Sequence, residues 1–508
     1  VGGGGGGGVK VAVRLQRGER ALLEASAESD AASGAWHVEL DLAWASGDAG
    51  DYAPFQVNVT TSDGEHALLT DVVGGDVYYC SGQSNMQWPL RATFNATEEA
   101  ARGDALGERV RVFSADIGDD VPADEPRLVL ARATPWQRAS AERLMGFSAV
   151  CWLTARHSLD LRAGTASARV PFGLVQSAWG GTRIETWMSP EALAKCDAAA
   201  PPAAHNATAW AVDGDARFYV GSSSSSTRNP NALSALYNGM VHPFSLGRYG
   251  VKGFLWYQGE SNVNAADAYR CQFVAMIDDW RQRFAQRDGV PVPLFGFVQL
   301  APWTTTGPVP ALRAAQQHAY DALPRMLMAV AIDTGDANDS GNGDIHPRSK
   351  GELGHRLALG IDHFVFGDTR YPWRSPVAAS ATAADGGAAA LVSFGADSCG
   401  GVSGNLELRE PHIPQPWCLP GHENTCSWFA LRGADGEWHN ATVIQPTAAC
   451  TLRVALGATD AAAGGAAAGG AVAAAVARAA ARRDAAAAAA AVVESVVAHT
   501  SPGVAGCA

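Results

Sequence analysis

The sequence predicts an α/β protein in which a parallel β-sheet is flanked by β-sandwich-like regions. Between Asp76 and about Phe366, short apolar runs alternate with longer stretches of helical periodicity. This rhythm is typical of β-α-β units around a parallel sheet. On either side of that part, apolar and polar residues alternate, as in half-buried antiparallel strands. A chain of 508 residues that is 47% hydrophobic can bury a large core and form about two to four domains.

The N-terminal β region is expected to span residues 9–75. Alternating apolar and polar residues predict strands at 9–13, 36–42 and 55–60.

The central domain is expected to span residues 76–366. Continuous apolar runs predict parallel strands at 77–80, 172–177, 253–258, 294–300 and 326–332. Helices are predicted at 148–159, 267–286, 311–322 and 349–361. The second of these helices carries an aromatic stripe, which we interpret as core packing rather than a cofactor site.

A C-terminal β region is expected at residues 371–458, with strand-like pieces at 390–394 and 428–431. One interpretation is that it completes the same sandwich as the first β region. Residues 459–508 form an Ala-rich low-complexity tail that has high helix propensity and little to bury. We expect no chemistry from this tail.

Charge and hydropathy exclude some classes of partner. The chain has 38 basic and 51 acidic residues and a formal charge of −13, so phosphate backbones would be repelled and no nucleic acid is expected. The longest uncharged late run, at 461–477, is short for a membrane span and contains glycines. We therefore expect no membrane span.

Nine cysteines show no C-x-x-C spacing, which argues against a zinc or iron–sulfur site. Five Asn-x-Ser/Thr sequons favour a secretory route. Four late cysteines could pair in an oxidising compartment, with the connectivity open and at least one of the nine thiols left over. The chain opens on Val1 and a glycine run without a signal peptide, so we expect a fragment.

The first candidate site residue is Ser84, in the segment Gly82-Gln83-Ser84-Asn85 that ends an apolar run. A serine at a strand-to-helix turn lies at the carboxyl edge of the sheet, where backbone N–H groups can face developing negative charge. The same tetrapeptide also fits an ordinary turn. Its interpretation as a nucleophile depends on the downstream loops.

Three further polar loops follow predicted parallel strands. Gly180-Gly181 permits a tight turn that brings a backbone N–H close to a substrate. The segment at 256–262 concentrates Gln258, Glu260 and Asn262, which would be costly to bury without a purpose.

The last loop contains Asp344-Ile-His346-Pro347. Histidine is the general base that a serine needs at neutral pH, and a carboxylate on its far nitrogen would hold the tautomer. Such a segment could also be a helix-capping loop. Four polar loops after four strands of one sheet favour a serine esterase.

Together these motifs resemble the SGNH hydrolases and, more closely, the sialate O-acetylesterase family. The resemblance covers about residues 75–361 and rests on Gly82-Gln-Ser-Asn-Met86, on the segments at 147–152, 179–187 and 256–262, and on Asp344-Ile-His-Pro347. It implies a three-layer, flavodoxin-like SGNH hydrolase domain. It also implies removal of O-acetyl groups from sialic acids in a secreted or lysosomal setting, without a metal or an organic cofactor.

The resemblance also implies roles for individual residues. Ser84 would be the nucleophile and His346 the base, while the N–H groups of Ser84 and Gly181 and the amide of Asn262 would form the oxyanion hole. Gln83, Gln258 and Glu260 would line the substrate pocket.

The supporting acid stays open. The superfamily's acid stands three residues before the histidine, where this chain has Gly343, whereas Asp344 stands two before it. Asp344 is the first candidate, and Asp333, Asp336 or a Ser–His dyad without an acid are the alternatives.

Two alternatives to the sialate esterase remain. The same scaffold could deacetylate xylan or another polysaccharide, because the motifs encode ester chemistry and say little about the sugar. A non-catalytic glycan-binding protein would instead use the tryptophans of these loops to stack on sugar rings.

Overall fold

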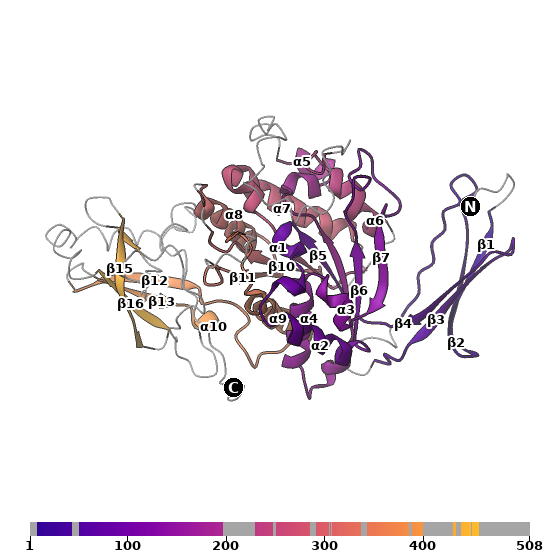
Figure 1. Cartoon of the computed structure of the whole chain (residues 1–508), viewed down its shortest axis with the longest axis horizontal. Coiled ribbons are helices and arrows are strands. Elements are labelled where there is room, and N and C mark those ends of the chain that lie inside the picture. The colour runs from indigo at the N-terminus through magenta and orange to yellow at the C-terminus, as the bar shows by residue number, and fades with distance from the viewer. Residues whose placement is uncertain are drawn as a thin grey trace.

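The computed structural model contains one large, mostly parallel sheet and two smaller antiparallel sheets (Figure 1). It describes residues 8–42, 50–196, 229–246, 250–284, 291–303, 305, 307–336, 343–385, 389–399, 430–432, 438–448 and 450–456. The large sheet lies in the middle of the molecule and the smaller sheets lie at opposite ends of it. The hypothesis that the two outer β regions complete one sandwich is therefore wrong.

The central sheet has seven strands in the order β11-β10-β9-β5-β8-β6-β7. All neighbours are parallel except the edge strand β7, which runs antiparallel to β6. The strands are β5 (Asp76–Gly82), β6 (Val110–Ala115), β7 (Ala133–Arg138), β8 (Phe172–Ala178), β9 (Gly253–Tyr257), β10 (Leu294–Gln299) and β11 (Met326–Val330).

All five predicted parallel strands are confirmed, because each contains a mostly apolar run that is buried in the sheet. The edge pair β6 and β7 was not predicted. Strand β7 has mostly exposed side chains and includes Pro135, so neither alternation nor a continuous apolar run marks it.

Helices lie on both faces of this sheet, with α7 and α8 on one side and α4 and α9 on the other (Figure 1). The four predicted helices are confirmed, with ends that differ by a few residues: α4 (Ala149–Leu161), α7 (Ala266–Arg283), α8 (Val309–Ala322) and α9 (Lys350–Phe366). The aromatic stripe of α7 is buried in the main core, as predicted. Shorter helices include α1 (Ser84–Gln87), α2 (Ala96–Leu106), α3 (Ala141–Met145), α5 (Pro190–Ala194) and α6 (His242–Ser245).

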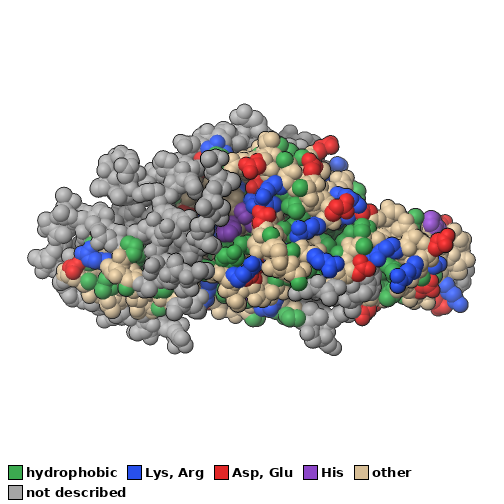
Figure 2. Space-filling model, turned by 90° about the horizontal axis from the view of Figure 1, so that it is seen from below, with side chains coloured by type: hydrophobic (Ala, Val, Ile, Leu, Met, Phe, Trp, Pro, Cys, Tyr) green, Lys and Arg blue, Asp and Glu red, His purple; other side chains and the backbone are tan. Residues whose placement is uncertain are grey.

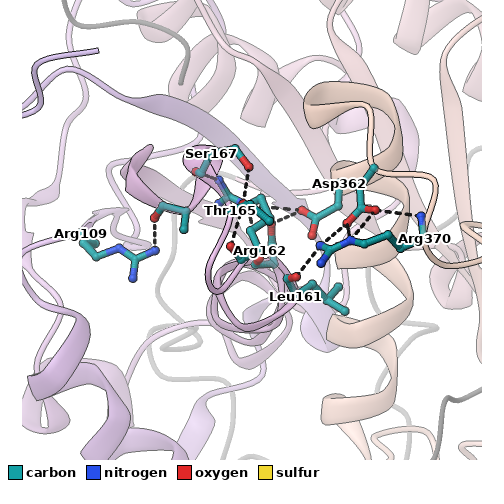
Figure 3. A network of polar contacts seen from close by, with 10 residues as sticks. Arg109, Leu161, Arg162, Thr165, Ser167, Asp362 and Arg370 are labelled. Atoms are coloured by element: carbon teal, nitrogen blue, oxygen red, sulfur yellow. Dashed lines mark hydrogen bonds and ion pairs between the residues drawn. The ribbon is translucent and has the colours of Figure 1, made fainter. Parts of the chain in front are cut away.

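A buried polar network ties the C-terminal end of α4 to the C-terminal part of α9 (Figure 3). The Arg162 guanidinium lies 3.6 Å from the Asp362 carboxylate and covers the ring of Phe366. Ser158 donates to Asp362 through its hydroxyl. Burial raises the pKa of Asp362 to about 7, because its hydrogen bond and ion pair compensate only part of the desolvation.

The N-terminal sheet has four antiparallel strands in the order β2-β1-β3-β4. They are β1 (Lys10–Arg17), β2 (Arg20–Glu28), β3 (Phe55–Thr61) and β4 (His66–Val72). The strands predicted at 9–13 and 55–60 are confirmed, but residues 36–42 form no strand. Val38, Leu40 and Leu42 instead pack on the apolar face of the sheet. The alternation there reports burial of every second side chain without strand pairing.

The C-terminal sheet has five described strands in the order β12-β13-β16-β15-β14. They are β12 (Ala378–Ala384), β13 (Ala389–Phe394), β14 (Ala430–Arg432), β15 (Trp438–Ala448) and β16 (Thr451–Leu456). The strand predicted at 390–394 is confirmed. The piece at 428–431 lies partly outside the described residues, and the Ala-rich tail lies wholly outside them.

Three disulfides join described cysteines: Cys80–Cys151, Cys196–Cys271 and Cys399–Cys450. The first pins β5 to α4 in the core just before the nucleophile turn. These bonds fit an oxidising, extracellular type of environment. Cys418, Cys426 and Cys507 lie outside the described residues.

Surface charge is mixed. Figure 2 shows basic and acidic side chains interspersed over the described residues on one face. In the part of the chain that the structure describes, no helix is both long and apolar enough to span a bilayer. No group of three or more His, Cys, Asp or Glu within the same residues could hold a metal ion.

Candidate active site

Ser84 is exposed to the site by a turn that only glycine can make. β5 ends at Gly82, whose φ is +139°, and a Cβ atom there would lie 2.2 Å from the Tyr257 carbonyl oxygen of the neighbouring strand. The Gln83 N–H donates to that same carbonyl at 3.0 Å. The chain then enters α1, whose first residue is Ser84, half-buried at the carboxyl edge of the sheet.

His346 lies directly opposite this serine. Its Nε2 is 2.9 Å from Ser84 Oγ, although the two residues are 262 positions apart in sequence. The ring stacks on Trp88 with 4.6 Å between ring centroids and 16° between planes. Trp88 is buried and follows α1, so one short segment supplies both the serine and the surface that orients the imidazole.

Two of the three candidate acids are paired with arginines. Asp333 binds Arg356 through both carboxylate oxygens, at 2.7 and 2.6 Å. Asp336 binds Arg348 in the same bidentate manner, at 2.6 and 3.0 Å, and is buried. Asp344 is half-buried in the turn that carries His346. In this turn the backbone N–H of His346 donates to the Gly343 carbonyl at 3.2 Å.

The Gly180-Gly181 turn packs against the nucleophile. A Cβ atom on Gly180 would lie 3.1 Å from Ser84 Cβ, and Gly181 has a φ of +72°. The Gly180 N–H is occupied, because it donates to Gln87 Oε1 at 2.8 Å. Among the described residues, no acceptor takes a hydrogen bond from the N–H of Ser84 or Gly181. Both donors are therefore available to a developing oxyanion.

Asn262 is buried between two loops of the site. Its Oδ1 accepts from Ile184 N–H at 2.9 Å and from Gln258 Nε2 at 2.7 Å. Its Nδ2 donates to Glu185 Oε2 at 2.9 Å. An amide nitrogen carries two hydrogens, and this bond uses one of them.

The three predicted pocket residues are buried and bonded to neighbouring loops. Gln83 Oε1 accepts from the Ser261 N–H at 3.2 Å, and Gln258 Nε2 donates to the Thr182 carbonyl at 3.1 Å. Glu260 Oε1 accepts from Asn85 Nδ2 at 2.6 Å. Within the described chain, Gln258 Oε1 and Glu260 Oε2 have no hydrogen-bond partner.

Several residues of the site were not predicted. Asn85, Gln87, Trp88 and Lys350 connect the nucleophile turn to the other loops. Asn231 holds the glycine turn by donating to the Gly181 carbonyl at 3.1 Å. Asn85, Gln87 and Trp88 follow the serine directly and could have been suspected from proximity, but no local signal distinguishes Lys350 or Asn231.

A serine bonded to a histidine at the carboxyl edge of a parallel sheet, beside unoccupied N–H groups, is the arrangement of a serine-type hydrolase. Three comparisons narrow this class. The family described as "Carbohydrate esterase, sialic acid-specific acetylesterase" matches residues 74–362.

The human sialate O-acetylesterase is 33% identical over 391 residues, which are 73% of this chain and 68% of that protein. The mouse sialate O-acetylesterase is 32% identical over 402 residues, covering 73% and 70% of the two chains. A carbohydrate acetylesterase from Xanthomonas citri has a similar structure, with a TM-score of 0.65 and 28% identity over 89% of this chain and 85% of that one.

The chain belongs to the sialic acid-specific acetylesterase family of carbohydrate esterases, and it is a carboxylic ester hydrolase. The resemblance deduced from the four loops is thereby confirmed.

Proposed function

We propose that this protein removes O-acetyl groups from sialic acids or related glycans by an acyl-enzyme mechanism. The observation that carries this proposal is the 2.9 Å contact between Ser84 Oγ and His346 Nε2. This is the distance at which a histidine can take the proton of an attacking hydroxyl.

In the first step, Ser84 Oγ attacks the acetyl carbonyl while His346 Nε2 accepts the hydroxyl proton. The oxyanion is stabilised by the N–H groups of Ser84 and Gly181, with the second amide hydrogen of Asn262 as a further donor. The ester C–O bond then breaks, and the sugar oxygen takes the proton from His346. In the second step His346 deprotonates a water molecule, which attacks the acetyl-serine. The bond between the acetyl carbon and Ser84 Oγ then breaks, Oγ takes the proton back from His346, and acetate leaves.

We assign Asp344 as the acid that supports the imidazolium. The support for this choice is that Asp333 and Asp336 each form a bidentate pair with an arginine. Such pairs lower the capacity of a carboxylate to serve another cation and fix its orientation. Asp344 lies in the same turn as His346, two residues before it, and is half-buried there.

The pocket roles of Gln83, Gln258 and Glu260 remain part of the proposal. The buried oxygens Gln258 Oε1 and Glu260 Oε2 have no hydrogen-bond partner within the described residues. A buried acceptor without a hydrogen bond is unfavourable, so a donor group on a bound substrate would be stabilised by bonding to it. A sugar hydroxyl is a donor of this kind.

We further propose the following organisation. Residues 9–75 form an N-terminal β region, 76–366 a flavodoxin-like SGNH domain, 371–458 a C-terminal β region, and 459–508 a tail. The protein would act in a secreted or lysosomal setting, which the three disulfides support.

The test compares the protein with its Ser84→Ala variant on p-nitrophenyl acetate, with Ser33→Ala, an exposed serine of the N-terminal region, as the matched control. We expect Ser84→Ala to lose at least about 1,000-fold in kcat and Ser33→Ala to keep its activity. Equal activity of Ser84→Ala and the unmodified protein would refute the mechanism.

The substrate is tested separately by measuring acetate release from O-acetylated sialic acid and from acetylated xylan. The bacterial relative is described as a carbohydrate acetylesterase without a stated sugar. A preference for acetylated xylan would therefore leave the proposed esterase mechanism intact and would replace sialic acid as the proposed substrate.

A further inference from the structure

The side chain of Asn85 joins three loops of the site. Asn85 is 1% exposed. Its Nδ2 donates to Glu260 Oε1 at 2.6 Å and to the Ile345 carbonyl at 2.9 Å. Its Oδ1 accepts from Lys350 Nζ at 2.5 Å. The amide therefore uses both of its hydrogens and its oxygen.

The positions of these contacts in the chain connect the two reacting side chains. Asn85 directly follows Ser84, and Ile345 directly precedes His346. One hydrogen bond, from Asn85 Nδ2 to the Ile345 carbonyl, thus links the backbone beside the nucleophile to the backbone beside the base. The separation of Ser84 and His346 depends on how this amide is oriented.

We propose that Lys350 and Glu260 act through Asn85 as positioning residues that hold Ser84 and His346 at hydrogen-bonding distance. This inference rests on the proposed function. The ammonium of Lys350 can only donate to Asn85, and the carboxylate of Glu260 accepts from it. Together they fix which end of the amide faces which neighbour. A flipped amide would place an oxygen against Glu260 and a nitrogen against Lys350.

The surroundings of Lys350 indicate that this position is costly to maintain. Its side chain is fully buried at the start of α9, with Nζ 4.9 Å from the centre of the Tyr257 ring. The charged groups that face it are Glu260 and Asp336. Burial lowers the pKa of Lys350 to about 7, and burial raises the pKa of Glu260. Burying such groups without a specific purpose is unfavourable.

The hydrogen bond to Asn85 survives a change in the charge of Lys350. A neutral amine retains two N–H donors, so it can still bond Asn85 Oδ1. Loss of the side chain, in contrast, removes the only donor that the structure shows on this oxygen. We therefore expect substitution at Lys350, rather than its titration, to misplace the Ser84–His346 pair.

The experiment is a double-mutant cycle on Lys350→Met and Asn85→Ala, measured as kcat and KM for p-nitrophenyl acetate. Lys252→Met is the matched control. Lys252 is an exposed lysine that pairs with Asp76 at the opposite end of the parallel strands. Ser84→Ala is included so that failure of the esterase proposal is seen separately.

We expect Lys350→Met and Asn85→Ala each to lower kcat on the order of 10- to 100-fold, because small misplacements of reacting groups cost this much. KM should change by less than about threefold. The double variant should be no slower than the slower single variant, because both changes break one path. Lys252→Met should keep the activity of the unmodified protein.

Two results would overturn the inference while leaving the esterase intact: full kcat in Lys350→Met when Ser84→Ala is inactive, or losses that multiply in the double variant. If Lys350→Met fails to fold, the Asn85→Asp variant tests the inference in its place. Its carboxylate still accepts from Lys350, but it cannot donate to Glu260 or Ile345. A folded Asn85→Asp variant with unchanged kcat would also overturn the inference.

Discussion

Replacing Lys350 with methionine should change how the stability of the protein depends on pH. The unfolded chain holds this lysine at its ordinary pKa of 10.5, whereas burial lowers the pKa in the folded protein to about 7. Between these two values the unfolded state binds the proton and the folded state does not. The free energy of unfolding therefore rises with pH across this window. Below the window both states hold the proton, and this group makes no contribution to the pH dependence.

The size of the effect follows from the two pKa values. A group that is protonated only in the unfolded state changes the free energy of unfolding by up to about 1.4 kcal/mol per pH unit. Half of the folded molecules are still protonated at pH 7, so the rise from pH 7 to pH 9 amounts to about 2 kcal/mol. Methionine cannot titrate, and the Lys350→Met variant should lack this rise.

The assay is urea unfolding at pH 7, 8 and 9, followed by the fluorescence of the tryptophans buried in the central core. Linear extrapolation gives the free energy of unfolding at each pH, and the quantity of interest is the difference between the unmodified protein and Lys350→Met. The exposed Lys252 serves again as control through Lys252→Met. A difference that stays constant from pH 7 to pH 9 would refute the argument that burial shifts the pKa of Lys350.

Three further predictions concern the site and the surface. With neutral His346 as the base, kcat/KM should fall in acid as the imidazole becomes protonated, and a profile flat from pH 5 to 8 would contradict this role. Gly82→Ala should abolish activity and lower stability by about 1 to 3 kcal/mol, since its φ of +139° and the adjacent carbonyl exclude a Cβ. Gly351→Ala, where an added Cβ would meet no atom within 4 Å, should not lower stability in the same urea-unfolding assay. Asn95, an exposed sequon residue just before α2, should carry an N-glycan when the protein passes through a secretory pathway; peptide mass spectrometry that finds Asn95 unmodified would contradict this.

The sequence revealed those parts of the fold that depend on local patterns. The five core strands and four main helices could be predicted because each buries a long, distinctive apolar pattern. The pattern failed at residues 36–42, where Val38, Leu40 and Leu42 are half-buried against the sheet but no strand forms. It failed again at β7, an edge strand with an exposed surface. At both places, strand pairing depends on neighbours that are distant in sequence.

Ser84 and His346 could be predicted from the sequence, because a nucleophile turn and an Asp-x-His-Pro loop each have a recognisable local sequence pattern. The structure brings them to 2.9 Å. The pairing of Asp333 and Asp336 with arginines could not be predicted from the sequence, because an ion pair formed by the fold leaves no pattern in the spacing of residues along the chain.

The sequence by itself determined the class of chemistry, since a serine and a histidine after buried parallel strands must meet at the carboxyl edge of one sheet. Only the tertiary structure decided which side chains hold them there. Asn85 lies 265 residues from Lys350 and 175 from Glu260. The stabilising hydrogen bonds among these three groups exist only because the fold removes them from water together, and desolvation is a property of the packed chain rather than of any segment.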